Sequence, residues 1–450
     1  MIRPLGGKNI VLLVFSLLFY AWGEPVYVFL LIVSVLINYL FGLGMGAEGC
    51  RKKLLLCLSI VYNLLTLGVF KYAGLAVETF NQLTSLSLPV PTIALPIGIS
   101  FYTFQTMTYV VDVYRGHAKV QRSPVRFLLY VSMFPQLIAG PIVRYADIET
   151  QLNSREHTAE NAFYGLLRFS IGLGKKVLIA DYAGQIASRL LEGQLAFSTT
   201  AGLWLGVLMF SFQLYFDFSG YSDMAIGLGH VFGFKFRENF DHPYMSRSIT
   251  EFWRRWHISL GTFFRDYVYI PLGGNRKRKY FNLLITWALT GLWHGASWNF
   301  LLWGLYFFVL LAVEKLTMRW LRRVSAVLRI TATMFLVLLG WTLFYFTDFT
   351  ELLTAVRIMF GFGGSGLINA QIRIQLLNAL PLLAVCVLGS TRLPQIVGDW
   401  LGLLCAAKEA GGKKQIIYVI LTFLFCAAIL ALSTISLVGS SYSPFLYYRF

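Results

Sequence analysis

Charged side chains are scarce in this chain. Asp, Glu, Lys and Arg make up 13% of its 450 residues, whereas hydrophobic residues make up 57%. Soluble domains carry roughly 25% charged residues, because their surfaces must be hydrated. The composition therefore excludes a string of soluble domains and predicts an all-α polytopic membrane protein.

Acidic residues are scarcer still, with 21 Asp and Glu against 38 Lys and Arg. Nucleic-acid binding would explain such a balance in a soluble protein. Here the cations lie in short loops between apolar runs, as expected for cytoplasmic loops of membrane proteins. Residues 3–8, 51–53 and 115–126 carry Lys and Arg, whereas the connections near Glu24 and at 79–91 carry none. This pattern predicts a cytoplasmic amino terminus and no nucleic-acid partner.

Cysteine and the usual nucleotide motifs are also rare or absent. The five cysteines have neither metal-ligand nor disulfide spacing. Lys175 follows Gly174 without the earlier glycine of a phosphate-binding loop, and Gly229 is not followed by the third glycine of a dinucleotide fingerprint. We therefore expect no metal site, no tightly bound cofactor and no chemistry driven by ATP or redox cofactors.

Long uncharged runs are what the chain has in abundance. Together with the amino-terminal segment and a glycine-rich stretch near 161–174, they predict about eleven membrane crossings of about 20 residues each. We treat residues 1–450 as a single membrane domain with three parts: spans in 1–200, a polar and aromatic core in 201–313, and further spans in 314–450. The runs lie at 25–47, 54–70, 79–111, 127–143, 193–216, 280–313, 330–347, 374–391 and 416–448.

The core begins with a basic and aromatic segment. Residues 235–279 hold ten Lys and Arg and four Asp and Glu among many aromatic side chains. This mixture suits the headgroup level of a bilayer, so we predict short amphipathic or re-entrant helices. Ser248 followed by Glu251 resembles a helix N-cap with its acidic residue. Pro271 should break the chain before the basic cluster 276–279.

The next uncharged stretch, 280–313, contains one histidine, His294. Its 34 residues are too many for one span and too few for two, which predicts a break near 291–295. An ionisable side chain at such a depth faces the protein interior or a cavity, and a histidine exchanges protons near pH 7. His294 is therefore a candidate base, with a structural hydrogen bond across helices as the alternative.

Other polar residues of the core have two interpretations each. His257 is either a second site residue facing His294 or an interfacial anchor. Asp217 lies near the end of an uncharged run, as does Asp223, and we expect both to be paired with arginines, with a proton relay or ion site as the alternative. The arginines considered are Arg254, Arg255 and Arg265.

These residues carry a resemblance to the bacterial membrane-bound O-acyltransferases. The similar motifs are Trp-His-Gly-Ala-Ser-Trp at 293–298, Glu-Phe-Trp-Arg-Arg-Trp-His-Ile-Ser-Leu at 251–260 and Phe-Arg-Asp-Tyr-Val-Tyr-Ile-Pro-Leu-Gly-Gly at 264–274. Others begin at Phe134, Tyr215 and Pro444, so the resemblance spans nearly the whole chain. A sister group that D-alanylates teichoic acids shares the Arg-Trp-His and Trp-His-Gly elements.

The resemblance implies a ring of about eleven helices around a central tunnel, with His294 catalytic and His257 a second site histidine. The donor would be acetyl-CoA or an acyl-carrier thioester, and the acceptor a hydroxyl of an extracytoplasmic polysaccharide or of a partner protein that relays the acetyl group. The enzyme would work in the bacterial inner membrane beside polysaccharide-modifying proteins. The residues expected to contact substrate are Trp293, Ser297, Trp298, Arg254, Arg255, Arg265, Arg276 and Lys277.

Two other functions stay open at this stage. One is D-alanyl transfer to teichoic acid from a carrier protein. The other is a proton-coupled transporter or flippase of a cell-surface polymer precursor, with His294 as the coupling residue. Transporters of that kind often contain internal repeats, and the sequence contains none that we detect.

Overall fold

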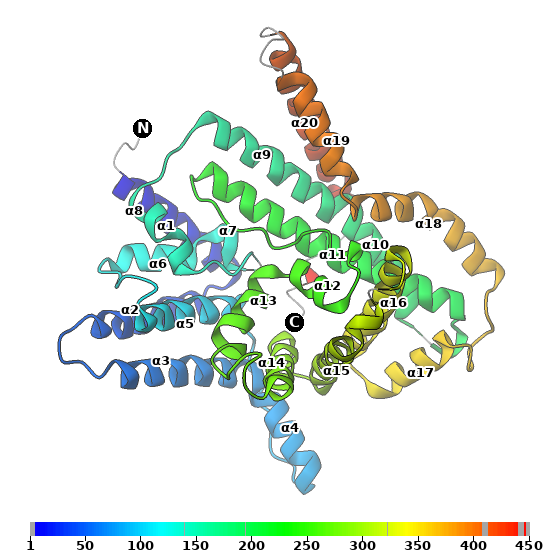
Figure 1. Ribbon diagram of the computed structural model, residues 1–450, viewed down its shortest axis with the longest axis horizontal. Helices are drawn as coiled ribbons and strands as arrows, with labels where there is room; N and C mark the ends of the chain where they lie inside the picture. Colours follow the sequence, from blue (N-terminus) through cyan, green and yellow to red (C-terminus); the bar gives the residue numbers. More distant parts are fainter. Residues whose placement is uncertain are drawn as a thin grey trace. The chain divides into compact units, whose positions relative to one another are not determined.

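The computed structural model describes residues 5–138, 140–193, 195–321, 323–406, 413–439 and 445–446, and every regular element within these ranges is helical (Figure 1). The predicted all-α class is confirmed. The chain forms two compact units, one of Met1–Gly165 with Ala225–Arg237, the other of Leu166–Met224 with Glu238–Phe450. Whether they act as the single domain expected above stays a prediction.

In the first unit, a buried polar layer joins three of the apolar helices. Asn38 of α2 accepts hydrogen bonds from Ser59 and Asn63 of α3, and Thr106 of α5 donates to Asn63. Such bonds hold helices together where the hydrophobic effect does not. The helices are α1 (Leu5–Gly23), α2 (Tyr27–Met45), α3 (Lys52–Leu67), the π-helix η1 (Gly68–Tyr72), α4 (Ala73–Thr84), α5 (Ile99–Arg115), α6 (Pro124–Ser132), α7 (Phe134–Leu137) and α8 (Tyr145–Asn153).

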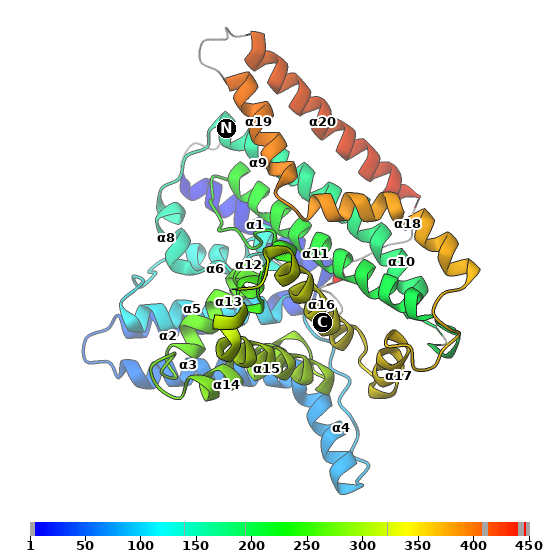
Figure 2. The same ribbon diagram turned by 45° about the vertical axis from the view of Figure 1, so that its right-hand side comes forward.

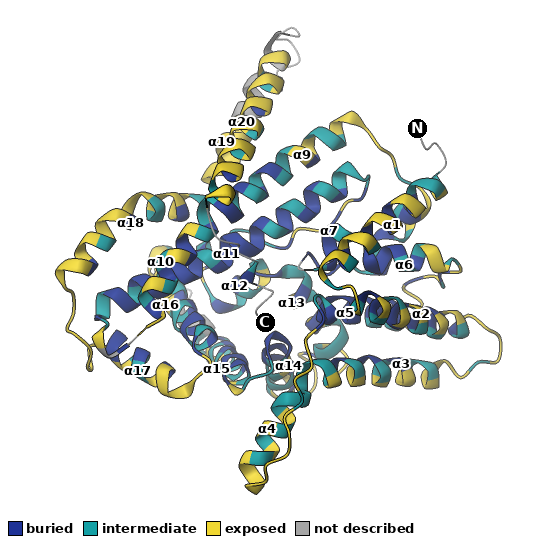
Figure 3. Ribbon diagram, turned by 180° about the vertical axis from the view of Figure 1, so that it is seen from behind, coloured by how far each residue is buried: buried dark blue, intermediate teal, exposed yellow. Residues whose placement is uncertain are grey.

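The second unit contains the polar and aromatic core, and its helices α18, α19 and α20 are largely exposed (Figures 2 and 3). Its elements are η2 (Lys175–Ala180), α10 (Asp181–Leu191), η3 (Leu195–Phe197), η4 (Pro243–Met245), α12 (Ile249–Arg255), α13 (Ile258–Phe264), η5 (Arg265–Tyr269), α14 (Lys279–His294), α15 (Trp298–Leu321), α16 (Ala326–Tyr345), α17 (Phe349–Met359), α18 (Ala370–Gly389), α19 (Leu393–Ala406) and α20 (Lys413–Val438), together with parts of α9 (Ala159–Gly174) and α11 (Thr200–Val231).

Eight helices in the described part of the chain are long and apolar enough to cross a membrane. The expected count of about eleven is not confirmed. Three of the expected crossings form shorter helices instead, since α5 has 17 residues, α6 has 9 and α9 has 16. Burial also divides the candidate spans, because 78% of the most apolar stretch of α11 is buried, against 11% of that of α20.

The basic and aromatic segment folds into the short helices that its composition predicts. Ser248 caps α12 by accepting a hydrogen bond from the Glu251 backbone N–H at 3.1 Å, and the Glu251 carboxylate accepts one from the Arg247 N–H. This is close to the capping box expected from the spacing. Beyond η5, the residues around Pro271 form turns that end at the first residue of α14.

Candidate active site

Helices α14 and α15 form a hairpin that positions His294. A Cβ added at Gly291 would lie 2.3 Å from the Phe300 backbone oxygen, and one at Gly304 would lie 2.3 Å from the Trp287 backbone oxygen. Only glycine leaves room for this approach of the two backbones, as in other membrane helix pairs built on small residues. The hairpin therefore presents the carboxyl end of α14 to the first turns of α15.

His294 is the last residue of α14, and the helix breaks immediately after it. Residues 295–297 are not helical, and α15 begins at Trp298. The predicted break is therefore confirmed. A Cβ at Gly295 would lie 2.1 Å from the Phe300 ring, so this ring packs directly on the break.

The His294 side chain lies among aromatic rings and is 9% exposed. Its ring centroid is 4.9 Å from that of Trp303 and 5.4 Å from that of Phe344, both edge-on. Trp293, predicted to contact substrate, stands 4.9 Å from it. The histidine is thus enclosed on several sides by rings that exclude water.

Two neighbours of His294 in the sequence occupy different positions. A helix continued past His294 would place Ser297 and Trp298 on its face, but α14 ends before them. Ser297 lies half-buried in the break, and Trp298 begins α15 with 46% of its surface exposed.

His257 lies in the turn between α12 and α13, close to Trp293. It is 2% exposed, and its ring is 4.6 Å from that of Phe218 and 6.0 Å from that of Trp293. Its backbone is left-handed, with φ 44°. This conformation costs a non-glycine residue of the order of 1–3 kcal/mol and persists where the surroundings enforce it, commonly at functional sites.

Asn239 is the residue that enforces this turn, and its sequence context does not predict that role. Its side-chain oxygen Oδ1 lies 3.2 Å from His257 Nδ1 and accepts from the Ser259 backbone N–H at 3.1 Å and from Ser259 Oγ at 2.9 Å. Its backbone oxygen accepts from the Ile258 N–H at 2.9 Å. Its Nδ2 donates to Ser222 Oγ at 3.2 Å, and the residue is 1% exposed.

The electrostatics of this turn keep His257 neutral. Burial lowers the pKa of the His257 imidazole well below its usual range, and the neighbouring His294 lowers that pKa further. The remaining ring nitrogen, Nε2, is buried and has no hydrogen-bond partner among the described residues. The two histidines therefore influence each other, as expected if they face one site.

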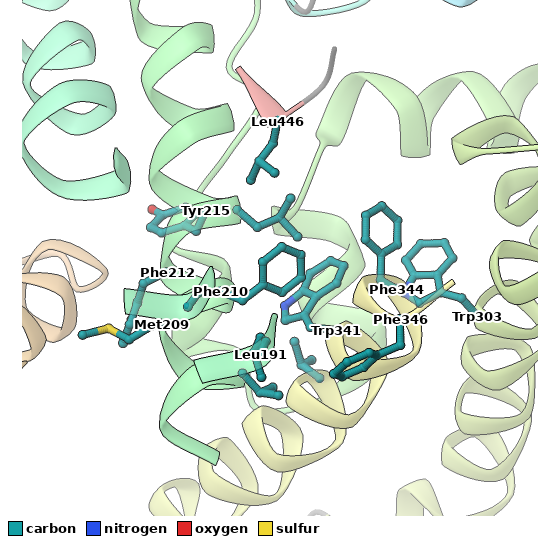
Figure 4. Packing of buried hydrophobic residues seen from close by; sticks show 14 of the residues in the cluster. Leu191, Met209, Phe210, Phe212, Tyr215, Trp303, Trp341, Phe344, Phe346 and Leu446 are labelled. Carbon is teal, nitrogen blue, oxygen red and sulfur yellow. The ribbon is translucent and has the colours of Figure 1, made fainter. Parts of the chain in front are cut away.

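His294 packs against an aromatic cluster of the second unit, part of which is drawn in Figure 4. Figure 4 shows Trp303, Trp341 and Phe344 packed together, and Trp253 lies 5.5 Å from Trp303 between ring centroids. In this cluster the Trp303 and Trp253 indole N–H groups are buried and have no acceptor within the described ranges. The indole of Trp303 is therefore an unused hydrogen-bond donor packed against His294.

The two buried aspartates are paired, but not with the arginines we expected. Asp217 pairs with Lys176 at 2.7 Å. Asp223 pairs with Lys175 at 2.6 Å and with Arg168 at 2.8 Å. These cations come from α9 and η2, which the sequence pattern did not bring near α11.

The predicted arginines and lysines lie toward the outside of the second unit. Arg255 is half-buried and pairs with Glu251 at 2.6 Å, and the exposed Arg265 pairs with Asp266 at 2.7 Å. Arg254 is exposed at the end of α12. Arg276 and Lys277 are exposed in the turns before α14.

Comparison with known proteins identifies the family. The sequence profile of MBOAT, the membrane-bound O-acyltransferase family, matches residues 115–356, a range that includes both histidines and Asn239. The chain belongs to the membrane-bound O-acyltransferase family. The probable alginate O-acetylase AlgI of Azotobacter vinelandii is 41% identical over 100% of this chain and 96% of its own length.

Two more relatives show the range of the family. The peptidoglycan O-acetyltransferase of Helicobacter pylori is 35% identical over 78% of this chain and 73% of its own length. The teichoic acid D-alanyltransferase of Bacillus subtilis is 29% identical over 55% of this chain and 68% of its own length. This membrane-bound O-acyltransferase is thus a multi-pass membrane enzyme that transfers acyl groups to oxygen.

Three contacts of the candidate active site were missed by sequence reasoning: Asn239, Trp303 and Phe344. Trp303 could have been found from the pair Gly291 and Gly304, because small residues mark close helix contacts in membranes. Asn239 offers no such signal, since its role arises from a turn that only the folded chain shows.

Proposed function

We propose that this enzyme transfers an acetyl group from a cytoplasmic thioester to a hydroxyl of an extracytoplasmic polysaccharide, directly or through a partner protein that relays it, with His294 as general base. The observation that carries the proposal is the position of His294, buried at a break between two helices and enclosed by aromatic rings, with an unused N–H donor of Trp303 against it.

The chemistry requires one proton acceptor and one hydrogen-bond donor. His294 takes the proton of the attacking hydroxyl while the hydroxyl oxygen forms a bond to the thioester carbonyl carbon. The carbonyl oxygen becomes an oxyanion, and the buried N–H of Trp303 is suited to stabilise it, because such donors are strongest where water is excluded. The C–S bond then breaks, and the thiolate leaves with the proton that His294 returns.

The donor and the acceptor follow from charge and from the relatives. The exposed cations Arg276 and Lys277 attract the phosphates of acetyl-CoA or of a carrier protein's prosthetic group by charge. The relatives' names include alginate O-acetylase and peptidoglycan O-acetyltransferase, which favours acetyl transfer to a surface polymer over D-alanyl transfer. We place the enzyme in the bacterial inner membrane, with a cytoplasmic amino terminus, beside polysaccharide-modifying proteins.

The test is acetyl transfer by the purified protein in bilayer discs, given radiolabelled acetyl-CoA and unacetylated alginate oligosaccharides. With the oligosaccharide present we expect label in it, and in the absence of oligosaccharide we expect slow release of labelled acetate. His294→Ala should reduce the rates of both reactions by about 10²-fold or more. Because the loss of a base lowers the rate of the chemical step and not the binding of the donor, the KM for acetyl-CoA should change little.

A matched variant separates chemistry from folding. His230, in α11, is partly buried and packs edge-on against Tyr164, and His230→Ala should retain activity near that of the unaltered enzyme. If His294→Ala is folded and keeps full transfer, the proposed function is wrong. Label that crosses sealed vesicles without transfer would instead indicate a transporter.

A further inference from the structure

The hydrogen bonds of Asn239 determine which way its side-chain amide points. The Ser259 backbone N–H lies 3.1 Å from the amide and can only donate a hydrogen bond. The amide atom facing it must therefore be the oxygen, since an NH₂ group there would set two donors against each other. On the other side, Nδ2 donates to Ser222 Oγ at 3.2 Å, which agrees with this orientation.

The orientation of Asn239 fixes the tautomer of His257. Asn239 Oδ1 stands 3.2 Å from His257 Nδ1 and only accepts, so Nδ1 must carry the hydrogen. Ser259 Oγ lies 3.4 Å from Nδ1, but its own hydrogen is donated to Asn239 Oδ1 at 2.9 Å. A neutral imidazole has one N–H group, so Nε2 is left with a lone pair.

The lone pair of Nε2 is buried where nothing in the described part of the chain donates to it. The His257 ring is surrounded by Phe218 from α11, Trp293 from α14 and the Asn239 side chain. The titratable group that affects its charge is His294. A buried acceptor left unmet costs about 1–3 kcal/mol. Nε2 can therefore accept a hydrogen bond from a bound ligand. It cannot stabilise an oxyanion, because its lone pair repels negative charge.

We propose that Asn239 is a positioning residue that holds His257 in the Nδ1–H tautomer, so that Nε2 accepts a hydrogen bond from a hydroxyl of the carbohydrate acceptor. This inference rests on the direct form of the proposed function, in which the enzyme itself transfers the acetyl group to the carbohydrate. The reacting hydroxyl gives its proton to His294, and a neighbouring hydroxyl of the same sugar, which stays intact, donates to His257. The two histidines thus divide the work between proton removal and acceptor binding.

The tautomer is measured by solid-state NMR of ¹⁵N-histidine-labelled protein in bilayers at neutral pH. The chain has six histidines, and His257→Gln identifies the resonances of His257. We expect a protonated Nδ1 and an unprotonated Nε2, and we expect Asn239→Ala to abolish this preference. An Nε2–H tautomer or a doubly protonated ring in the unaltered enzyme would overturn the inference, whatever the enzyme's activity.

Kinetics then separate acceptor binding from thioester chemistry. Asn239→Ala should raise the KM for alginate oligosaccharides about tenfold, the effect of one lost hydrogen bond, and leave acetate release from acetyl-CoA nearly unchanged. Ser222→Ala, which removes a bond on the opposite side of the same amide, should change that KM by less than about twofold. Equal losses in both variants, or parallel loss of acetate release, would show that Asn239 is only structural.

The conservative variant Asn239→Asp supplies a further readout. Its carboxylate still accepts from Nδ1, so the oligosaccharide KM should stay near that of the unaltered enzyme at alkaline pH. The negative charge raises the pKa of His257, so His257 becomes protonated at a higher pH than in the unaltered enzyme. On acidification, the variant should therefore lose transfer activity at a higher pH than the unaltered enzyme does. An unchanged acid limb would contradict the role assigned to His257. The proposed function itself fails by a different result, full transfer by folded His294→Ala.

Discussion

At the scale of single residues, the unused donor of Trp303 is the feature most directly tied to the chemistry. Trp303 is 0% exposed and its indole packs edge-on against His294. A buried N–H without an acceptor destabilises the protein by about 1–3 kcal/mol. A preorganised donor lowers a reaction barrier when it is positioned where negative charge develops in the transition state.

Trp303→Phe keeps a ring in this position and removes the N–H. We expect kcat for acetyl transfer to fall by about 10²-fold, in the range known for lost oxyanion donors, with little change in the KM for acetyl-CoA. Trp287→Phe is the matched control, because Trp287 belongs to the same cluster but its indole nitrogen is not among the buried atoms without a partner. Equal losses of kcat in the two variants would assign the effect to packing.

Residue-level prediction from the sequence succeeded where a side chain is anomalous in its own segment. His294 stands out because it is ionisable within 34 uncharged residues, and it does lie buried at the expected break. The partner of Asp217 was mispredicted because separation along the chain does not determine distance in space, since Lys176 and Arg254 lie about equally far from Asp217 in the sequence. Asn239 was missed because an asparagine between charged residues is unremarkable until the turn around it forms.

At the scale of elements, the site depends on how closely α14 approaches α15. The 34-residue length of the uncharged stretch predicted a break, and the length argument needs no tertiary information. The closeness of the two helices was not predicted. The close approach arises because Gly291 and Gly304 face each other across the two helices. Which residues face each other depends on where the break between the helices lies.

Gly304→Ala should separate these helices. The new Cβ would lie 2.3 Å from the Trp287 backbone oxygen, which no rotamer change relieves. We expect a loss of about 1–3 kcal/mol in stability and a lower kcat, because Trp303 shifts with the helix that carries it. Thermal unfolding in detergent and the transfer assay measure the two effects.

A glycine in open space provides the control for this substitution. A Cβ at Gly68, in η1, would meet nothing within 4 Å. Gly68→Ala should leave activity unchanged and stability equal or slightly higher, since alanine favours helix. If Gly304→Ala behaves in the same way, close packing of α14 on α15 is not what positions the site.

At the scale of the whole chain, composition settled the class and left the arrangement open. Scarce charge predicted a helical membrane protein, but the expected count of about eleven spans is not confirmed, because hydropathy does not reveal where a helix stops. α5 ends at Arg115 after 17 residues, and α6 ends at Ser132 after 9. Long-range pairing was equally hidden, as the contacts of Lys176 show.

Lys176 joins three parts of the second unit that lie far apart in the sequence. Its Nζ is 2.7 Å from Asp181 and 2.7 Å from Asp217 of α11, and it lies 4.9 Å from the centre of the Phe445 ring. Asp217 also accepts a hydrogen bond from the Leu446 N–H at 2.9 Å. Residues 445 and 446, near the carboxyl end, are thereby tied to α11 and η2.

Lys176→Met should destabilise the protein strongly, since it leaves the 4%-exposed Asp217 carboxylate without its cation. Losing one partner of a buried pair costs about 3–5 kcal/mol, whereas neutralising both costs less. Thermal unfolding should therefore show a large drop for Lys176→Met and a partial recovery when Asp217→Asn is added. Arg265→Gln breaks an ion pair whose arginine is 61% exposed, and its effect should stay within about 1 kcal/mol. A double variant no more stable than Lys176→Met would show that the charge of Asp217 is not what Lys176 compensates.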